Sequence, residues 1–265
     1  MLIEMPTVRS SALFLFAHQD DEFGIFQRIM DEKRQGRRVL CAYLTTGVPS
    51  GVLSLRRNYE SLAVLAKLGV QDEDVFFAGH TLSIPDGGLL DHLEVAADWI
   101  ALWINDAQAV KAVYIPAWEG GHHDHDALHG VSVSVAQEAG LINTVRQFPL
   151  YNRYRCKGPF FRVLLPLPLN GDIEKISLPW INRLQFLRYC LSYPSQATTW
   201  VGLFPFVLLH YILYGTQALQ PVSRERLYRR PHEGSLYYER RQFCTWEKMS
   251  TRLLEFTERR NGRAS

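Results

Sequence analysis

Apolar segments typical of buried strands alternate with segments of helical periodicity in the first half of the sequence. We predict strands at 11–17, 38–45, 75–78 and 112–116, with helical segments between them. Because the connections are too long for hairpins, the strands are expected to run parallel. This alternation predicts an α/β fold of the doubly wound kind, a Rossmann-like three-layer sandwich with a mostly parallel sheet and a C-terminal extension.

The length of the chain fits one large domain. At 265 residues it can bury a sizeable core, and no internal repeat or low-complexity tract divides it. After residue 147 the periodicity weakens and prolines, arginines and tyrosines become frequent. We therefore predict a single domain over 1–265, with an α/β core at 1–147 and a C-terminal part at 148–265 that completes the fold and the substrate pocket.

Charge and cysteine content narrow the range of partners and locations. The chain has 29 Lys and Arg against 27 Asp and Glu, so its overall charge does not favour nucleic acid. Its four cysteines are widely spaced and form no CxxC pair. That usage is typical of reduced thiols rather than a disulfide framework. We predict no nucleic-acid partner and a cytoplasmic location.

One long apolar segment bears on membrane association. Residues 200–214 are apolar apart from His210, but they include Pro205 and are shorter than the roughly 20 residues that a spanning helix requires. No transmembrane segment is therefore predicted. The segment could instead form a buried helix, a contact in a homo-oligomer or a peripheral membrane contact through 200–214.

Charged residues gather where the first predicted strand ends, in the run His18, Gln19, Asp20, Asp21 and Glu22. In doubly wound sheets, ligands bind beyond the carboxyl ends of the strands. His18 and Asp21 could bind one cation, which would leave Asp20 free to act on water. The run could equally form a helix cap, in which Asp20 or Asp21 accepts from the first amides of the next helix.

A second cluster follows the strand predicted last. It contains His122, His123 and His125, with Asp124 among them and two glycines in front. Imidazole nitrogens suit zinc and other borderline divalent metals, and a nearby carboxylate can orient a ligand ring. A polar helix start would explain the same residues without a metal. Together the two clusters provide two histidines, a carboxylate and a spare carboxylate, which matches a catalytic zinc site with one open position.

Several short motifs follow one another in a characteristic order. They are AHQDDE at 17–22, LTTG at 44–47, RRNYESLAVLAKLGV at 56–70, PDGGL at 85–89 and GGHHDH at 120–125. The first and last resemble the AHPDDE and HPDH motifs of the PIG-L/LmbE-like N-acetylglucosaminyl deacetylase family. The resemblance covers about residues 11–140, and the combination is specific although each motif alone is weak.

The resemblance implies a metal site and three catalytic roles. The implied metal ligands are His18, Asp21 and His125. The cofactor would be Zn²⁺ or another divalent metal such as Fe²⁺, which acidifies a water molecule. Asp20 would be the general base, and a positively charged His122 would stabilise the tetrahedral intermediate. Asp124 would orient His122.

The implied reaction is hydrolysis of the acetamide of an N-acetylglucosamine-type sugar or glycoconjugate, which gives a free amine and acetate. The substrate would be a small molecule or a glycan, with or without a lipid. By the same resemblance Arg56, Arg57 and Asp86 are candidates for sugar contacts. Trp118 is a candidate for stacking on a sugar face, and His232 is a further candidate pocket residue.

The sequence departs from the family motifs at two positions and is compatible with further functions. Gln19 and His123 stand where relatives have proline, so each loop lacks a fixed φ. The run from His123 to Asp126 nearly forms the HxHxD motif of metallo-β-lactamase-like enzymes. The same clusters would also suit a zinc amidase acting on a non-sugar N-acyl substrate, or a non-catalytic glycan-binding protein with a degenerate site.

Overall fold

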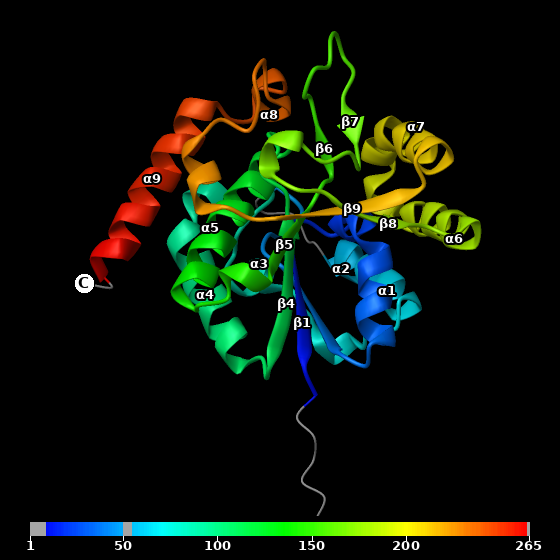
Figure 1. Cartoon of the computed structure of the whole chain (residues 1–265), viewed down its shortest axis with the longest axis horizontal. Coiled ribbons are helices and arrows are strands. Elements are labelled where there is room, and N and C mark those ends of the chain that lie inside the picture. Colours follow the sequence, from blue (N-terminus) through cyan, green and yellow to red (C-terminus); the bar gives the residue numbers. More distant parts are fainter. Residues whose placement is uncertain (1–8, 50–54, 264–265) are drawn as a thin grey trace, which may run out of the picture.

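The computed structural model describes residues 9–49 and 55–263, which form a mixed α/β fold around a seven-stranded sheet (Figure 1). The order of strands in this sheet is β3-β2-β1-β4-β5-β9-β8. Its strands are β1 (Ser11–Phe16), β2 (Arg38–Tyr43), β3 (Val75–Phe76), β4 (Val110–Pro116), β5 (Val145–Phe148), β8 (Glu174–Ser177) and β9 (Thr216–Pro221). A separate hairpin pairs β6 (Tyr151–Asn152) with β7 (Arg162–Val163).

The sheet is parallel from β3 to β5 and antiparallel at β9 and β8. All residues of β1 are buried, as expected for a strand covered on both faces. Leu13 and Leu15 pack into one hydrophobic core and Phe14 and Phe16 into the other, because successive side chains of a strand point to opposite faces. The predicted three-layer arrangement with a mostly parallel sheet is confirmed.

Helices cover both faces of the sheet (Figure 1). The core on one face includes side chains of α4, α5 and α9, and the core on the other includes side chains of α1, α2, α6 and α7. The helices are α1 (Phe26–Arg34), α2 (Leu55–Lys67), α3 (Ala78–Thr81), α4 (Leu93–Asp106), α5 (His123–Glu138), α6 (Trp180–Cys190), α7 (Ala197–Leu213), α8 (Tyr237–Arg240) and α9 (Trp246–Arg263). Short 3₁₀ helices lie between them.

The four strands predicted from the alternation are present, whereas β8 and β9 were not predicted. β9 has the sequence TQALQP, in which two glutamines interrupt the apolar pattern that marks a strand. Both glutamines are buried: Gln217 accepts hydrogen bonds from backbone N–H groups of α1, and Gln220 donates to two backbone carbonyls. Through β9 and β8 the C-terminal part extends the same sheet as the core.

The topology places the two charged clusters side by side. β1 pairs with β4 although about a hundred residues separate them, and the strand order reverses between these two strands. Such a switch point is where open α/β sheets bind ligands. The β6–β7 hairpin, α7 and α8 gather at the same end of the molecule as the carboxyl ends of the parallel strands (Figure 1).

Candidate active site

The loop after β1 is shaped by its own carboxylates. Oδ2 of Asp21 accepts the backbone N–H groups of Ala17 at 3.0 Å and His18 at 2.8 Å. The backbone N–H of Asp20 donates to Oε2 of Glu22 at 2.8 Å, and Asp20 has a φ of 113°. A non-glycine residue adopts this backbone conformation only where its surroundings enforce it. The loop is therefore built to hold Asp20 and Asp21 in fixed positions.

The buried side chain of Glu22 links this loop to β2. Its side chain is fully buried, and Oε1 accepts the hydroxyl of Tyr43 at 2.7 Å. Burial raises the pKa of Glu22 above its usual value. The short 3₁₀ helix Asp21–Gly24 has no side-chain cap from Asp20. The helix cap considered from the sequence is thus not realised, since Asp21 bonds to the preceding loop and Glu22 to the amide of Asp20.

His122 begins α5 as its N-cap. Its Nδ1 accepts the backbone N–H of Asp124 at 3.2 Å, so Nδ1 carries no proton and Nε2 is the protonated nitrogen of a neutral ring. Burial, with the charge of His18, lowers the pKa of His122 well below its usual value. In the free site the structure therefore favours a neutral His122, whereas its predicted positive charge beside the intermediate stays a prediction. The ring instead offers a neutral Nε2–H donor.

The carboxylate of Asp124 is fully buried and joins three parts of the site. Oδ2 accepts from His18 Nε2 at 3.0 Å and from the backbone N–H of Gly87 at 2.7 Å, and Oδ1 accepts from the backbone N–H of Leu89 at 3.1 Å. Burial raises the pKa of Asp124, but the hydrogen bond from His18 and the other histidine charges outweigh it and lower the pKa to about 2. Oδ2 lies 3.9 Å from Nδ1 of His122. Asp124 thus orients His122 through its backbone, while its carboxylate holds His18.

Among the residues that the structure describes, two groups of side chains are placed to hold a cation, and both include His18. One is the predicted set of His18, Asp21 and His125, whose candidate ligand atoms lie within 4.8 Å of one another. Nε2 of His125 is 3.0 Å from Oδ1 of Asp21. The structure therefore brings the three predicted ligands together from the loop after β1 and the first turn of α5.

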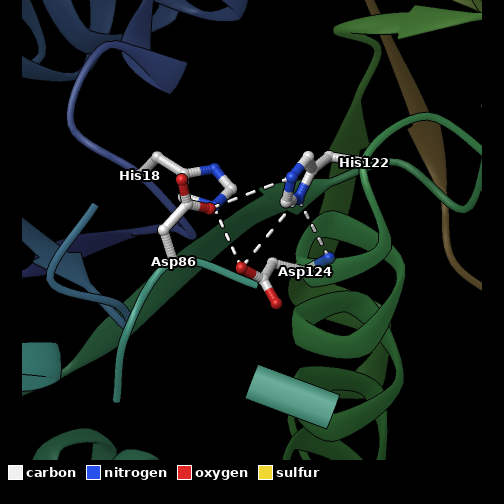
Figure 2. Close-up of side chains that lie close together, drawn as sticks. All are labelled: His18, Asp86, His122 and Asp124. Carbon is white, nitrogen blue, oxygen red and sulfur yellow. Dashed lines mark hydrogen bonds and ion pairs between the residues drawn. The ribbon is translucent and has the colours of Figure 1, made fainter. Parts of the chain in front are cut away.

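The second group is His18, Asp86, His122 and Asp124, whose side chains converge from three segments of the chain in Figure 2. Oδ1 of Asp86 lies 3.1 Å from Nε2 of His18 and 3.9 Å from Nε2 of His122. Asp86 belongs to the loop at 85–89, which is held in place because the carboxylate of Asp124 accepts the backbone N–H groups of Gly87 and Leu89. The sequence predicted Asp86 only as a sugar contact, whereas the structure also places it in a group of side chains that could hold a cation.

The charges of the site fit a divalent cation. Burial opposes a proton on His18, but Asp86, Asp124 and Asp21 outweigh it and raise the pKa of His18 well above its usual value. Burial opposes the ionised form of Asp21 as well, but the histidines lower its pKa well below the usual value. The same carboxylates that favour a proton on His18 would also stabilise the charge of a divalent cation. Imidazole nitrogens with carboxylate oxygens suit zinc, ferrous iron and similar divalent ions.

Asp20 lies beside these ligands with a charge partner of its own. Its Oδ1 is 3.2 Å from Nη2 of Arg57. Burial raises the pKa of Asp20 to about 7, although the guanidinium of Arg57 opposes the shift. A pKa near the working pH is what a general base requires. The geometry is therefore compatible with proton transfer by Asp20.

Hydrogen bonds restrain the loop in which Gln19 replaces proline. Nε2 of Gln19 donates to Oδ1 of Asn58 at 2.8 Å. The buried guanidinium of Arg57 donates to the backbone carbonyls of Gln19 and Gly47. The side chains of α2 thus supply a restraint where relatives have a proline ring.

Six of the predicted site residues line a cavity of about 220 Å³, whereas Asp124 and His125 lie behind its wall. Its lining from the first half of the chain is His18, Asp20, Asp21, Phe23, Arg57, Asp86 and His122. Its lining from the C-terminal part is Tyr151, Gln196, Thr199, Leu203, Tyr237, Arg241 and Phe243. The sequence analysis missed this second group; the only signal is that prolines, arginines and tyrosines become frequent after residue 147.

Not every predicted substrate contact reaches this cavity. Arg57 and Asp86 line it, but Arg56 does not. The side chain of Arg56 is 69% exposed and pairs with Glu60 at 3.2 Å on the outer face of α2. Adjacent residues of a helix point about 100° apart, so only one of two neighbouring arginines can face the site.

Trp118 and His232 lie outside the cavity. Trp118 is fully buried, its Nε1 donates to the carbonyl of Arg229 at 3.0 Å, and its ring packs against Trp246. The predicted stacking of Trp118 on a sugar is therefore wrong. His232 is also buried, with Nδ1 2.7 Å from the carbonyl oxygen of Glu233. Both side chains support the C-terminal part of the fold.

A metallo-β-lactamase-like site is contradicted by the direction of Asp126. Its carboxylate accepts the backbone N–H groups of Glu119 and Gly120 at 3.2 Å, so it turns away from the histidines and holds the loop before α5. His123 belongs to neither cation-binding group and lies 3.1 Å from the carbonyl of Gly87. Glu119 is buried in turn and accepts the N–H groups of Leu150 and Tyr151. Sequence reasoning missed this support of the site.

Comparisons with known proteins agree with this geometry. Residues 13–136 match the PIG-L family model, described as GlcNAc-PI de-N-acetylase. A deacetylase of the teicoplanin biosynthetic pathway is 19% identical, with a TM-score of 0.60 over 80% of this chain and 98% of that one. A zinc-inhibited form of teicoplanin deacetylase is 17% identical, with a TM-score of 0.59 over 80% of this chain and 98% of that one. N,N'-diacetylchitobiose deacetylase from Pyrococcus horikoshii is 14% identical, with a TM-score of 0.56 over 83% of this chain and 85% of that one. These likenesses show a shared fold; no curated protein matches the chain.

Proposed function

We propose that the chain, whose residues 13–136 match the PIG-L family model, is a metal-dependent hydrolase that removes the acetyl group from an N-acetylglucosamine-type sugar or glycoconjugate. The family and the deacetylases of the same fold support a de-N-acetylase. One observation carries the proposal: Asp20 lines the same cavity as His18, Asp21, Asp86 and His122, which belong to the two groups of side chains that suit a divalent cation. We further propose that residues 1–265 form a single domain. The proposed location of the protein is the cytoplasm.

His18, Asp21 and His125 would hold the cation. When bound, it would acidify a water molecule and polarise the acetamide carbonyl. The carboxylate of Asp20 would accept the proton of the attacking water while Arg57 keeps that carboxylate in place. Asp20 would then transfer the proton to the leaving amine, so that the C–N bond breaks and acetate and a free amine result.

His122 would stabilise the negative charge that develops on the carbonyl oxygen. Because its Nδ1 accepts from the backbone of Asp124, its Nε2–H is free to donate to that oxygen. A preorganised donor in a buried cavity stabilises such charge without reorganisation. This role needs no positive charge on the ring, in keeping with its lowered pKa.

The shape around the cavity favours a conjugate over a free monosaccharide. Tyr151, Thr199, Leu203, Tyr237 and Arg241 line both the catalytic cavity and a neighbouring groove of about 550 Å³. A sugar in the inner cavity would therefore leave the groove for the group attached to it. Aromatic rings and arginines in the groove suit a further sugar, a phosphate or the headgroup of a lipid-linked substrate.

Mass spectrometry tests the proposal. The protein, loaded separately with zinc and with ferrous iron, is incubated with a panel of N-acetylated sugars, sugar conjugates and simple N-acyl amides. We expect loss of one acetyl group from sugar conjugates and no reaction in the metal-free protein. The two metals are compared because a zinc-inhibited form is known for a deacetylase of this fold.

Two results would favour a different function. Turnover confined to non-sugar amides would identify an amidase. A protein that binds metal but releases acetate from no member of the panel would be a non-catalytic glycan-binding protein.

A further inference from the structure

The outer face of α7 is apolar and exposed to solvent. The stretch Pro194–Leu213 is long and apolar enough to cross a membrane by length and composition alone. Exposed side chains on this helix include Val201 at 78%, Leu209 at 51%, Ile212 at 52% and Leu213 at 63%. Exposed apolar side chains gathered on one element mark an interaction surface.

The inner face of the same helix is packed on the protein. Trp200, Val207 and Tyr211 are buried in the hydrophobic core on that side of the sheet. His210 is also buried, with its Nε2 2.7 Å from the carbonyl oxygen of Thr216. A spanning helix would have to leave these contacts. The geometry therefore fits a helix that stays on the domain and offers its outer face.

The β6–β7 hairpin continues this apolar surface. The rings of Phe161 and Phe206 lie 4.6 Å apart and join the hairpin to α7, and Phe160, in the loop just before β7, is 61% exposed. The buried guanidinium of Arg153 donates to the carbonyls of Phe160 and Gly158 at 2.8 and 2.7 Å. Hydrogen bonds thus fix the backbone that exposes Phe160.

The charge around this surface is basic and unpaired. The hairpin segment 149–171 contains four basic residues and no acidic one, and 178–215 contains two arginines and no acidic residue. Within residues 9–49 and 55–263, Arg155, Lys157 and Arg240 have no acidic partner. On the opposite side, α9 pairs its arginines with Glu94, Asp98 and Glu138.

The groove opens between the elements that carry these side chains. Its lining includes Pro159 and Phe161 of the hairpin, Thr198 and Gly202 of α7, and Arg240 of α8. Figure 1 shows the hairpin, α7 and α8 gathered at this end of the molecule. An apolar and basic rim therefore surrounds the outer mouth of the groove that leads to the catalytic cavity.

We infer that this face binds the surface of an anionic lipid bilayer. The docking face consists of Phe160, Val201, Leu209, Ile212 and Leu213. Apolar side chains enter the boundary between headgroups and acyl chains, and adjacent basic residues attract anionic lipids. Charge favours this partner over a second copy of the chain. Two such faces in contact would place the unpaired Arg155 and Lys157 of one copy near the same basic side chains of the other, and like charges repel.

The binding would place the groove against the headgroups, where a lipid-linked substrate would enter without leaving the membrane. The docking itself does not require the proposed deacetylation. A protein that binds vesicles without hydrolysing any N-acetyl sugar would support the surface and contradict the function.

Vesicle sedimentation with the full chain tests the inference. Vesicles of phosphatidylcholine alone are compared with vesicles that also contain phosphatidylglycerol. We expect binding to the anionic vesicles, a several-fold loss at high salt, and release from them by carbonate extraction. The variant Val201→Glu/Ile212→Glu should lose at least tenfold in partitioning.

A matched control and a second variant keep the result interpretable. Leu102→Glu alters a residue of α4 that is 66% exposed and outside the docking face, and it should bind as the unaltered protein does. Arg155→Gln/Lys157→Gln removes two exposed charges without touching the core, and should weaken binding to anionic vesicles by roughly 30-fold. Circular dichroism checks that each variant is folded, and if the glutamate variant fails to fold, this charge variant decides.

Four outcomes would overturn the inference. Equal binding of the unaltered protein to both vesicles, or none to either, would exclude an anionic surface as the partner. Resistance to carbonate extraction would indicate a spanning segment. A dimer in light scattering that Val201→Glu/Ile212→Glu dissociates, with no vesicle binding, would make the face a contact between copies of the chain.

Discussion

The two halves of the catalytic cavity differ in how their side chains are held. On the side built from β1, α2 and α5, residues such as His18, Asp21 and Asp124 are buried and hydrogen-bonded to one another. On the side built from the C-terminal part, Arg241 and Phe243 are exposed. The contrast suggests that the first side performs the reaction, while the second selects the substrate and the surface on which it is found.

If this division is correct, substitutions on the first side should affect metal content or kcat, and those on the second should affect KM for large substrates. The largest effect is expected at a metal ligand. His125→Ala should remove the bound cation and lower kcat by on the order of 10³-fold or more, since a cation supplies several kcal/mol of transition-state stabilisation. Metal analysis of the purified protein and steady-state kinetics measure both.

The neighbouring His123→Ala is the matched control for this loss. His123 belongs to neither cation-binding group, so its variant should keep the metal. Equal loss of metal from both variants would contradict the assigned ligand set.

The general base is expected to matter nearly as much. Asp20→Asn keeps the size of the side chain but cannot accept a proton, and kcat should fall by about 10²–10⁴-fold with metal content unchanged. Steady-state kinetics with an N-acetylated substrate that the unaltered protein hydrolyses measure this. A variant that retains more than half of the activity would assign proton transfer to another residue.

A change in the groove should have a smaller and more selective effect. Arg240 lines the groove but not the catalytic cavity. Arg240→Ala should raise KM for an anionic sugar conjugate roughly tenfold, as for loss of one hydrogen bond to a charged group, and leave the kinetics of a monosaccharide unchanged. Arg252→Ala on α9 serves as the control. If Arg240→Ala slows the monosaccharide equally, the proposed division between the two sides is wrong.

The smallest expected effect is on the free energy of unfolding, which should depend on pH through the buried His129 of α5. Burial lowers the pKa of His129 to about 4, while the carbonyl of Pro116 accepts from its Nδ1 at 2.8 Å and Arg226 lies nearby. The unfolded chain, with a histidine pKa near 6.5, binds a proton that the folded chain refuses between pH 6.5 and 4. The stability contributed by His129 is therefore complete above pH 6.5 and is lost as the pH falls.

Chemical unfolding of the metal-free protein at several pH values checks this sign. His129→Gln removes the titrating group, so its free energy of unfolding should change less steeply between pH 4.5 and 6, by about 1 kcal/mol per pH unit. Identical slopes for the two proteins would show that His129 is protonated in the folded state.

The comparison also explains which parts of the structure could be predicted. Strands β1, β2, β3 and β4 follow apolar runs, and the polar clusters that end β1 and β4 predict a functional site from residue types alone. In the C-terminal part the elements are short or mixed in pattern. β9 carries buried glutamines, and the groove is lined by residues scattered from Tyr151 to Arg241. Periodicity reports local structure and cannot report which distant loops meet.

The sequence alone determined the alternation of strands and helices and the residue types that suit a cation and a base, because both are local properties. Only the tertiary structure decided that β1 pairs with β4, that Asp86 joins His18 and His122, and that Trp118 is core while Arg57 faces the cavity. It also decided the state of His122, since a backbone N–H at Nδ1 and burial keep the ring neutral. These outcomes depend on contacts between residues far apart in the chain, whose energies exist only once the chain is folded.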